Sequence, residues 1–165
     1  MTKYSKEWSG LSPEVRGVIS QFQEEIPVKI GEVVKSFGVE LKVSTLDIGI
    51  SGMIFPSSDG HKIVINKHEP SYRQRFTLAH ELAHFLLHRH LIGSGISDNI
   101  LYRSKLSDLY EAEANRLASD ILMPVEKVKE LRAELAVERL ADVVSPLAAK
   151  FGVSEEAMRI RLGMK

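Results

Sequence analysis

The spacing of hydrophobic positions changes twice along the chain, and these changes divide it into helical, extended and again helical parts. Before residue 38 the apolar side chains recur at helical spacing. We predict one helix opened by Ser12 and Pro13, and a second over residues 27–37 that Gly38 closes. Three short segments with strand-like composition follow, at residues 39–44, 50–55 and 61–66. They predict a small three-stranded antiparallel sheet whose last two strands form a hairpin.

Beyond residue 66 the helical spacing returns. Ser71 and Gln74 form a capping-box pattern, and the helix they open is predicted to run to about residue 90. Residues 91–107 contain glycines and serines and indicate a loop long enough to act as a rim or lid. A helix over residues 108–123 must end before Pro124. Three more helices are predicted, at about residues 125–137, 138–151 and 154–162.

These elements predict an α+β protein that is mainly helical. With 165 residues, the chain is of a size that suits one domain. We divide it into N-terminal helices over residues 1–38, a sheet with two following helices over residues 39–125, and a C-terminal helical segment over residues 126–165.

Composition narrows the function. The 22 basic and 22 acidic residues balance, which argues against a protein that coats nucleic acid or an anionic membrane. The chain has no cysteine, so disulfides, thiolate zinc sites and a cysteine nucleophile are excluded. Any metal must be bound by histidine and carboxylate. Neither an apolar leader nor a membrane-length apolar run is present in the sequence, and we expect a cytoplasmic protein without a membrane partner.

His80, Glu81 and His84 form an H-E-x-x-H motif within the helix predicted from residue 71. Positions i and i+4 lie on one helix face about 6 Å apart along the axis, so both imidazoles can reach one ion. Glu81 can then act on a water molecule at that ion without binding the metal itself. Two histidines leave positions for a third protein ligand and for water, as in catalytic zinc sites. The alternative interpretation is a solvated helix face with no metal.

The third ligand is harder to identify. On a straight helix His88 lies about 12 Å along the axis from His80, too far to share one ion, so we expect it behind the ligands or at the surface. Glu111 and Glu113 begin the helix after the long loop. They point about 200° apart, so only one can face the metal, and their angles from the apolar stripe are nearly equal. Periodicity leaves the choice open. Both acids also suit a solvated first helical turn.

The segments RQRFTLAHELAHFLLH (residues 73–88) and EAEANRLASDILMP (residues 111–124) resemble the ImmA/IrrE family of bacterial and phage metallopeptidases. With the preceding strands, the resemblance covers about residues 28–125. It implies a zincin-like domain that binds one zinc ion through His80, His84 and Glu113, with Glu81 as the catalytic acid/base. The choice of Glu113 rests on the resemblance, and Glu111 is the alternative ligand. Leu117 stands where the family usually has Phe, a conservative change.

The resemblance also implies a function: a zinc-dependent endopeptidase that cleaves a regulatory protein, with a helix-turn-helix repressor as the expected substrate. A peptidase needs a donor for the oxyanion besides the metal. Tyr72, His88 and Tyr110 are candidates for this role or for contacts behind the ligands, as is Arg75. Manganese and iron accept the same ligand types, although zinc suits them best.

Residues 147–163 suggest a helix, a short turn and a second helix, the order found in helix-turn-helix DNA readers. Glu155 and Glu156 open the second helix, where they would repel phosphates, so we favour a helical hairpin packed on the catalytic part. DNA binding by residues 146–163, with a structural or vestigial metal site, stays as an alternative function. Sequestration of a repressor without proteolysis is another.

Overall fold

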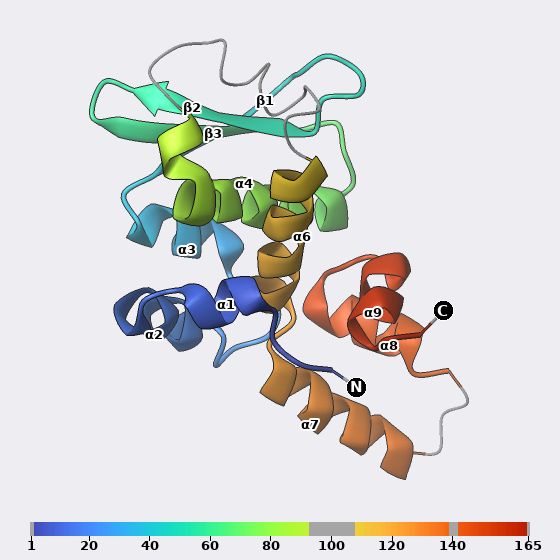
Figure 1. The fold of residues 1–165 in the computed structure, drawn as a ribbon. Helices are drawn as coiled ribbons and strands as arrows, with labels where there is room; N and C mark the ends of the chain where they lie inside the picture. Colours follow the sequence, from blue (N-terminus) through green and yellow to red (C-terminus); the bar gives the residue numbers. More distant parts are fainter. Residues whose placement is uncertain (1, 93–107, 139–141, 165) are drawn as a thin grey trace.

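The computed structural model describes residues 2–92, 108–138 and 142–164 (Figure 1). The expected lid at residues 91–107 therefore lies outside the described residues, apart from the last two residues of a helix. The described part confirms the α+β class. Its helices are α1 (Lys6–Gly10), α2 (Pro13–Phe22), α3 (Ile30–Ser36), α4 (Ser71–Ile92), α6 (Asp108–Leu122), α7 (Val125–Val137), α8 (Val144–Phe151) and α9 (Glu155–Arg161).

The sheet has three strands, β1 (Glu40–Ser44), β2 (Gly52–Ser57) and β3 (Gly60–Asn66), in the order β1-β3-β2. The predicted hairpin of β2 and β3 is present and antiparallel. The prediction of a wholly antiparallel sheet is wrong, because β1 pairs with β3 in parallel. The connection over residues 45–51 passes the end of β3, where the buried Asn66 amide donates to the carbonyl oxygens of Leu46 and Ile50. This crossover brings β1 to the far edge of β3.

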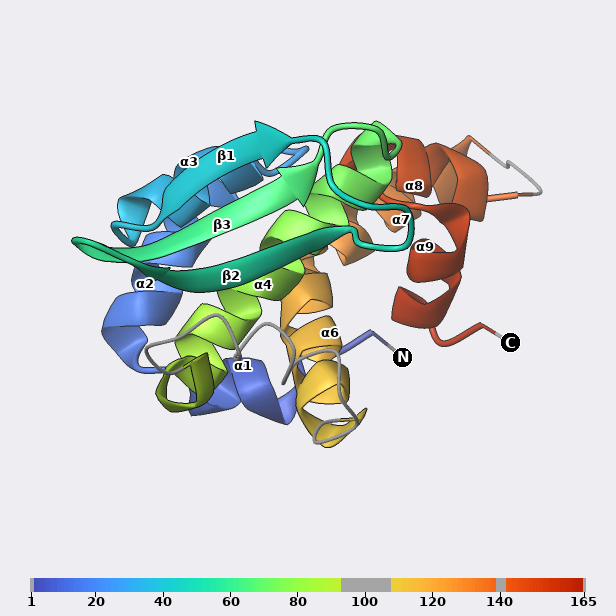
Figure 2. The ribbon, with the colours of Figure 1, turned by 90° about the horizontal axis from the view of Figure 1, so that it is seen from above.

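Helix α4 lies beneath the sheet and supports it (Figure 2). Leu78 and Leu82 of α4 are buried, as are Ile54 and Ile63 of the strands, so this interface forms part of the hydrophobic core. Gly52 allows a particularly close approach. A Cβ atom there would lie 2.6 Å from the Thr77 side chain and 2.9 Å from the Val64 carbonyl oxygen. Glycine at this position therefore holds β2 close to α4, one turn before the H-E-x-x-H motif.

Helix α6 crosses α4 on the side away from the sheet (Figure 1). Its contact face carries Ala114, Leu117, Ala118 and Ile121, all fully buried. The two alanines allow the helix backbones to approach closely, and the larger side chains fill the space on either side. This crossing brings the first turn of α6 to the middle of α4.

Helices α8 and α9 pack against each other as a helical hairpin that lies beside α6, to which Arg161 of α9 is joined through Asp120 (Figures 1 and 2). Gly152 joins them in the left-handed conformation, with φ of 66°. The Arg75 guanidinium of α4 donates to the carbonyl oxygens of Gly152, Phe151 and Val28. Arg75 thus donates hydrogen bonds to carbonyl groups at the carboxyl end of α8. Its guanidinium is therefore engaged in the fold.

Several helix boundaries differ from the prediction. Helix α1, capped by the Ser5 hydroxyl, is missing from the prediction because it is only five residues long and Trp8 is its one apolar side chain, so it shows no helical spacing. Helix α3 begins at Ile30 rather than at residue 27. Helix α8 begins at Val144 rather than at residue 138. At its start, the Asp142 side chain accepts a hydrogen bond from the Val144 amide. Within the described residues no helix is both long and apolar enough to cross a membrane.

The buried Glu7 of α1 accepts two hydrogen bonds from Arg116 of α6, at 2.7 and 3.0 Å. These bonds hold the pKa of Glu7 below its usual value. Stability from such a carboxylate is present above its unfolded pKa and disappears as the pH falls through the folded pKa. We expect Glu7→Gln to lower the free energy of unfolding by about 1–2 kcal/mol at pH 7, since Arg116 is partly solvent-exposed.

The measurement is urea unfolding of both proteins between pH 7 and pH 3. The difference between wild type and Glu7→Gln is expected to shrink below about pH 4.5. Glu14→Gln is the matched control, because Glu14 is exposed in the first turn of α2. A difference that stays constant over this pH range would contradict the ion-pair explanation.

Candidate metal centre

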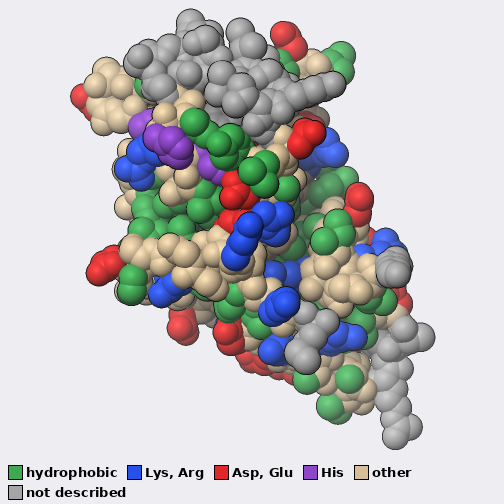
Figure 3. Space-filling view, in the orientation of Figure 1, with side chains coloured by type: hydrophobic (Ala, Val, Ile, Leu, Met, Phe, Trp, Pro, Cys, Tyr) green, Lys and Arg blue, Asp and Glu red, His purple; other side chains and the backbone are tan. Residues whose placement is uncertain are grey.

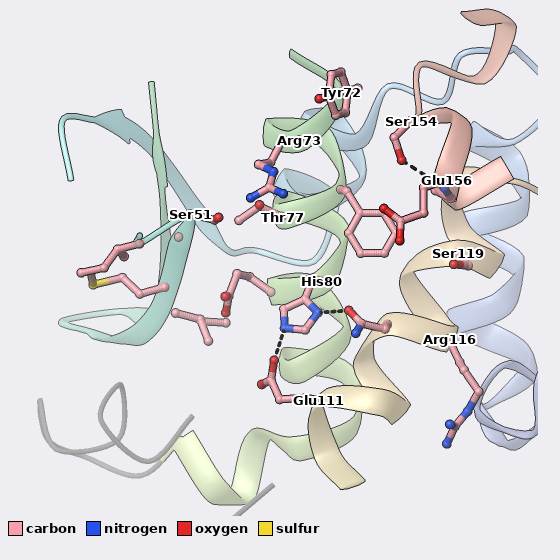
Figure 4. Close-up of a pocket in the computed structure, with 18 of the residues that line it drawn as sticks. Ser51, Tyr72, Arg73, Thr77, His80, Glu111, Arg116, Ser119, Ser154 and Glu156 are labelled. Carbon is pink, nitrogen blue, oxygen red and sulfur yellow. Dashed lines mark hydrogen bonds and ion pairs between the residues drawn. The ribbon is translucent and has the colours of Figure 1, made fainter. Parts of the chain in front are cut away.

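Three side chains from two helices converge on one point. His80 and His84 lie one turn apart on α4, and their Nε2 atoms are 3.1 Å apart. The Glu111 carboxylate of α6 lies 3.0 Å from His80 Nε2 and 2.9 Å from His84 Nε2. Figure 4 shows Glu111 directed at His80. Among the described residues these three form the cluster suited to holding a metal ion.

The outer nitrogens of both imidazoles have partners of their own. His80 Nδ1 lies 2.8 Å from Asn115 Oδ1, and His84 Nδ1 lies 2.9 Å from His88 Nδ1. A side-chain amide oxygen can only accept, so Asn115 fixes the proton of His80 on Nδ1. When His80 is neutral, its Nε2 lone pair then faces the shared point, as metal ligation requires.

Glu113 lies elsewhere. Its carboxylate oxygen is 3.2 Å from His88 Nε2, on the far side of His84 from the shared point. The structure thus brings Glu111 to the histidine pair, whereas the family resemblance led us to expect Glu113 there. The physical reason is the crossing of α4 and α6, which periodicity within α6 does not encode. Both acids contact histidines, but different ones.

The distances fit a small divalent cation. Tetrahedral zinc with bonds of about 2.0–2.1 Å holds its ligand atoms about 3.3–3.4 Å apart. Here the two Nε2 atoms are 3.1 Å apart, and the Glu111 carboxylate has one oxygen 3.0 Å from His80 and the other 2.9 Å from His84, so the side chains need only small movements to hold an ion. Two imidazoles and one carboxylate are also the ligand set of many catalytic zinc sites, which keep the fourth position for water. The residues present therefore fit zinc.

The protonation states of two ligands also suit a cation. Burial alone would raise the pKa of Glu111, but hydrogen bonds from His80 and His84 lower it to about 2. Burial lowers the pKa of His84 to about 4, and the neighbouring histidines His80 and His88 add to this shift. At neutral pH Glu111 is therefore an anion and His84 is neutral, which are the forms that bind metal.

His80 responds differently to its surroundings. Burial lowers its pKa, but the hydrogen bond to Glu111 and the negative charges of Glu81 and Glu111 outweigh this effect and raise it. The site therefore attracts positive charge at His80, supplied by a proton or by a metal ion. The negative charges of Glu81 and Glu111 stabilise either a proton or a metal ion at His80.

A cleft of about 690 Å³ opens in front of the cluster, and His80, Glu81 and Glu111 contribute to its lining. One wall is formed by residues 49–54, including the start of β2, and the opposite side includes α9 residues Glu156, Ala157 and Ile160. Figure 4 shows these walls on either side of α4. In the space-filling view, histidine side chains reach the surface beside acidic ones between α4 and α6 (Figure 3).

The other candidate residues fall into two places. Tyr72 lines the cleft at the start of α4 and is about half exposed (Figure 4). Tyr110 contacts the His88 ring edge to face, with 4.8 Å between the ring centroids. His88 itself is buried behind His84, and Arg75 is bound to backbone carbonyl groups away from the cleft. Only Tyr72 of these four therefore lies in the lining of the cleft.

Sequence reasoning missed Asn115. It lines the cleft and orients His80, and its position in the sequence carried a usable signal. Asn115 follows Glu111 by four residues, so the two side chains share one face of α6. If Glu111 reaches the imidazole pair, Asn115, one turn later on the same face of α6, is expected to lie close to the pair as well.

The fold is similar to that of a solved structure, a Mycobacterium tuberculosis transcriptional regulator. The two share 16% sequence identity, and the TM-score is 0.58. The match covers 98% of this chain but 49% of the regulator chain, so this chain spans about half the length of that relative. No curated protein matches the sequence.

The family comparison is more specific. The peptidase M78 family model, described as an IrrE N-terminal-like domain, matches residues 35–163. This match contains all three strands, both helices of the metal cluster, and α8 and α9. It confirms the resemblance found in the H-E-x-x-H and E-A-E-A-N segments and extends it to the C-terminal helices. The chain belongs to the peptidase M78 family of IrrE N-terminal-like domains.

Proposed function

We propose that the protein is a zinc-dependent endopeptidase. The observation that supports this most strongly is the convergence of His80, His84 and Glu111 at the floor of a cleft that Glu81 also lines. Bound zinc would lower the pKa of a water molecule and polarise a peptide carbonyl group. The choice of an endopeptidase rests on the family resemblance of the H-E-x-x-H and E-A-E-A-N segments.

In this proposal each residue has one role. His80, His84 and Glu111 hold the metal. The Glu81 carboxylate accepts a proton from the attacking water and then donates it to the amine that leaves when the peptide bond breaks. Asn115 keeps the proton of His80 on Nδ1. Tyr72 lines the cleft eight residues before His80, about 12 Å along the α4 axis, so it is placed to contact the substrate away from the bond that is cut.

A strand on one side and a helix on the other offer contacts to a substrate in the cleft. Strand β2 is at the edge of the sheet, hydrogen-bonded to β3 on one side in the part of the chain that the structure describes. Its start lines the cleft, so β2 borders any peptide bound there. Ile160 of α9, 69% exposed, offers an apolar contact on the other wall.

We further propose a helix-turn-helix repressor as the substrate. The family resemblance supports this choice, and the regulator that shares the fold is consistent with it. The test is incubation of the zinc-loaded protein with the repressor encoded beside its gene, followed by mass spectrometry of the products. Cleavage at one or a few bonds between folded domains is expected. A stable complex with an intact repressor would instead favour sequestration.

The structure gives little support to DNA binding by α8 and α9. Arg161 donates to Asp120, to the Met123 carbonyl oxygen and to the Lys3 carbonyl oxygen, and its side chain is 7% exposed. Arg159 pairs with Glu155. These arginines are therefore engaged in the fold or with acids of their own helix. The C-terminal hairpin is better described as a wall of the cleft.

This role of α9 leads to a prediction. Ile160→Asp places a charge where an apolar side chain of the substrate is expected to lie, and we expect kcat/KM to fall about tenfold. Zinc affinity is expected to stay unchanged, because Ile160 does not contact the ligands. Val137→Asp, at an exposed apolar position of α7 outside the cleft, is the matched control. Equal losses in both variants would argue against a substrate contact at Ile160.

A further inference from the structure

Behind the metal cluster, a continuous row of side chains starts at the proposed ligand His84 and continues through two residues to which the catalytic proposal gives no role, His88 and Glu113. His84 contacts His88 through their Nδ1 atoms at 2.9 Å, and His88 Nε2 contacts the Glu113 carboxylate at 3.2 Å. The row leads from the cluster along α4 and ends on α6. It links the two helices at a second place, separate from the Glu111 contact.

The protons of this row can be assigned from its ends. If His84 Nε2 faces a metal ion, its proton must be on Nδ1, and this N–H donates to His88 Nδ1. His88 then carries its own proton on Nε2 and donates it to Glu113, which as a carboxylate can only accept. Every donor in the row thus has an acceptor. No other tautomer of His88 satisfies both contacts while His84 is bound to metal.

We propose that His88 and Glu113 are positioning residues that orient His84 for the metal. This inference rests on the proposed function, and it gives Glu113 a role different from that of a ligand. Hydrogen bonds to the outer nitrogen of a ligating histidine fix its tautomer and ring orientation and raise its basicity. Here the acceptor for His84 is a second imidazole, and Glu113 fixes the tautomer of that imidazole in turn.

The local structure holds the row in place. His84 is fully buried and His88 is 3% exposed, so water does not compete freely for these contacts. The backbone of α4 departs from helical geometry at His88, with φ of −125° and ψ of 24°. Tyr110 packs edge to face against the His88 ring. The bend and the aromatic contact together set the direction in which the His88 nitrogens point.

The test compares zinc affinity, measured by competition with a chromophoric chelator, across four variants of the site and one control variant. His88→Phe removes the acceptor for His84, and Glu113→Leu removes the acceptor for His88. Each variant is expected to weaken zinc binding about 10- to 100-fold. His88→Asn keeps an acceptor near His84 and is expected to recover part of this loss. Glu111→Gln removes a ligand and is expected to weaken binding more than either. Glu134→Leu, at an exposed position of α7, is the matched control.

Cobalt absorption spectra separate positioning from ligation. Because His88 and Glu113 do not bind the metal in this proposal, their cobalt-loaded variants are expected to keep the visible band intensity of the wild type. Glu111→Gln is expected to change this intensity.

The proposal is overturned if Glu113→Leu alters the spectrum as Glu111→Gln does, or if neither His88→Phe nor Glu113→Leu changes zinc affinity. Circular dichroism identifies any variant that has lost the fold, and Glu113→Gln then replaces Glu113→Leu. These readouts do not depend on peptidase activity, so a failure of the proposed substrate leaves them interpretable.

Discussion

Replacing Glu81 by glutamine is expected to reduce cleavage of the repressor by about 10²- to 10⁴-fold while zinc stays bound. The amide has the same shape as the carboxylate but cannot accept a proton from the attacking water. Glu81 is buried at 8% exposure in the lining of the cleft and is near enough to His80 to raise its pKa. Its loss therefore removes proton transfer and leaves the three proposed ligands in place.

The measurement is a single-turnover time course of repressor cleavage, with the zinc content of both proteins determined in parallel. Glu69→Gln, on the loop before α4 and outside the cleft, is the control. If Glu81→Gln binds zinc and cleaves at the rate of the wild type, Glu81 is not the acid/base. If it binds no zinc, the residue contributes to the metal site itself.

Asp120→Ala is expected to cost about 3–5 kcal/mol of folding free energy, the largest stability effect that we predict. Asp120 is fully buried and pairs with Arg161 at 2.8 Å, and it accepts from the backbone and hydroxyl of Ser5. Burial raises the pKa of Asp120 although Ser5 and Arg161 act against this. Removing the carboxylate leaves the guanidinium of Arg161 buried without its counterion and removes the hydrogen bonds that join Ser5 to α6.

Urea unfolding at pH 7 measures this cost. Glu155→Ala is the matched control, since Glu155 pairs with Arg159 on the same helix as Arg161 but at the surface, where such pairs contribute about 0–1 kcal/mol. A loss in Asp120→Ala no larger than in Glu155→Ala would show that the buried pair does not hold α9 to the body. Because α9 forms one wall of the cleft, substrate cleavage should fall with the stability of this attachment.

Local sequence patterns predicted most of the helices and the hairpin, because capping residues, prolines and apolar spacing act within a few residues of each other. The partner of β1 could not be predicted in this way. Strand composition at residues 39–44 indicates extended structure, but the direction of pairing depends on the crossover that Asn66 holds. That information lies in contacts between segments far apart along the chain.

In the metal cluster too, local spacing predicted one part of the arrangement and contacts between distant segments determine the other. His80 and His84 are fixed relative to each other by one turn of a helix, so their sequence spacing was sufficient to place them together. Glu111 and Glu113 depend on how α6 crosses α4, and their spacing left two solutions. The structure places both acids on histidines, Glu111 on the His80 and His84 pair and Glu113 on His88.

A zinc-edge anomalous difference map of the crystallised, zinc-loaded protein tests the central claim most directly. The account predicts one strong peak about 2.0–2.1 Å from His80 Nε2, His84 Nε2 and a Glu111 oxygen, facing the cleft beside Glu81, with Glu113 still bound to His88. A peak ligated by Glu113 in place of Glu111, or the absence of a peak at His80 and His84, would contradict it.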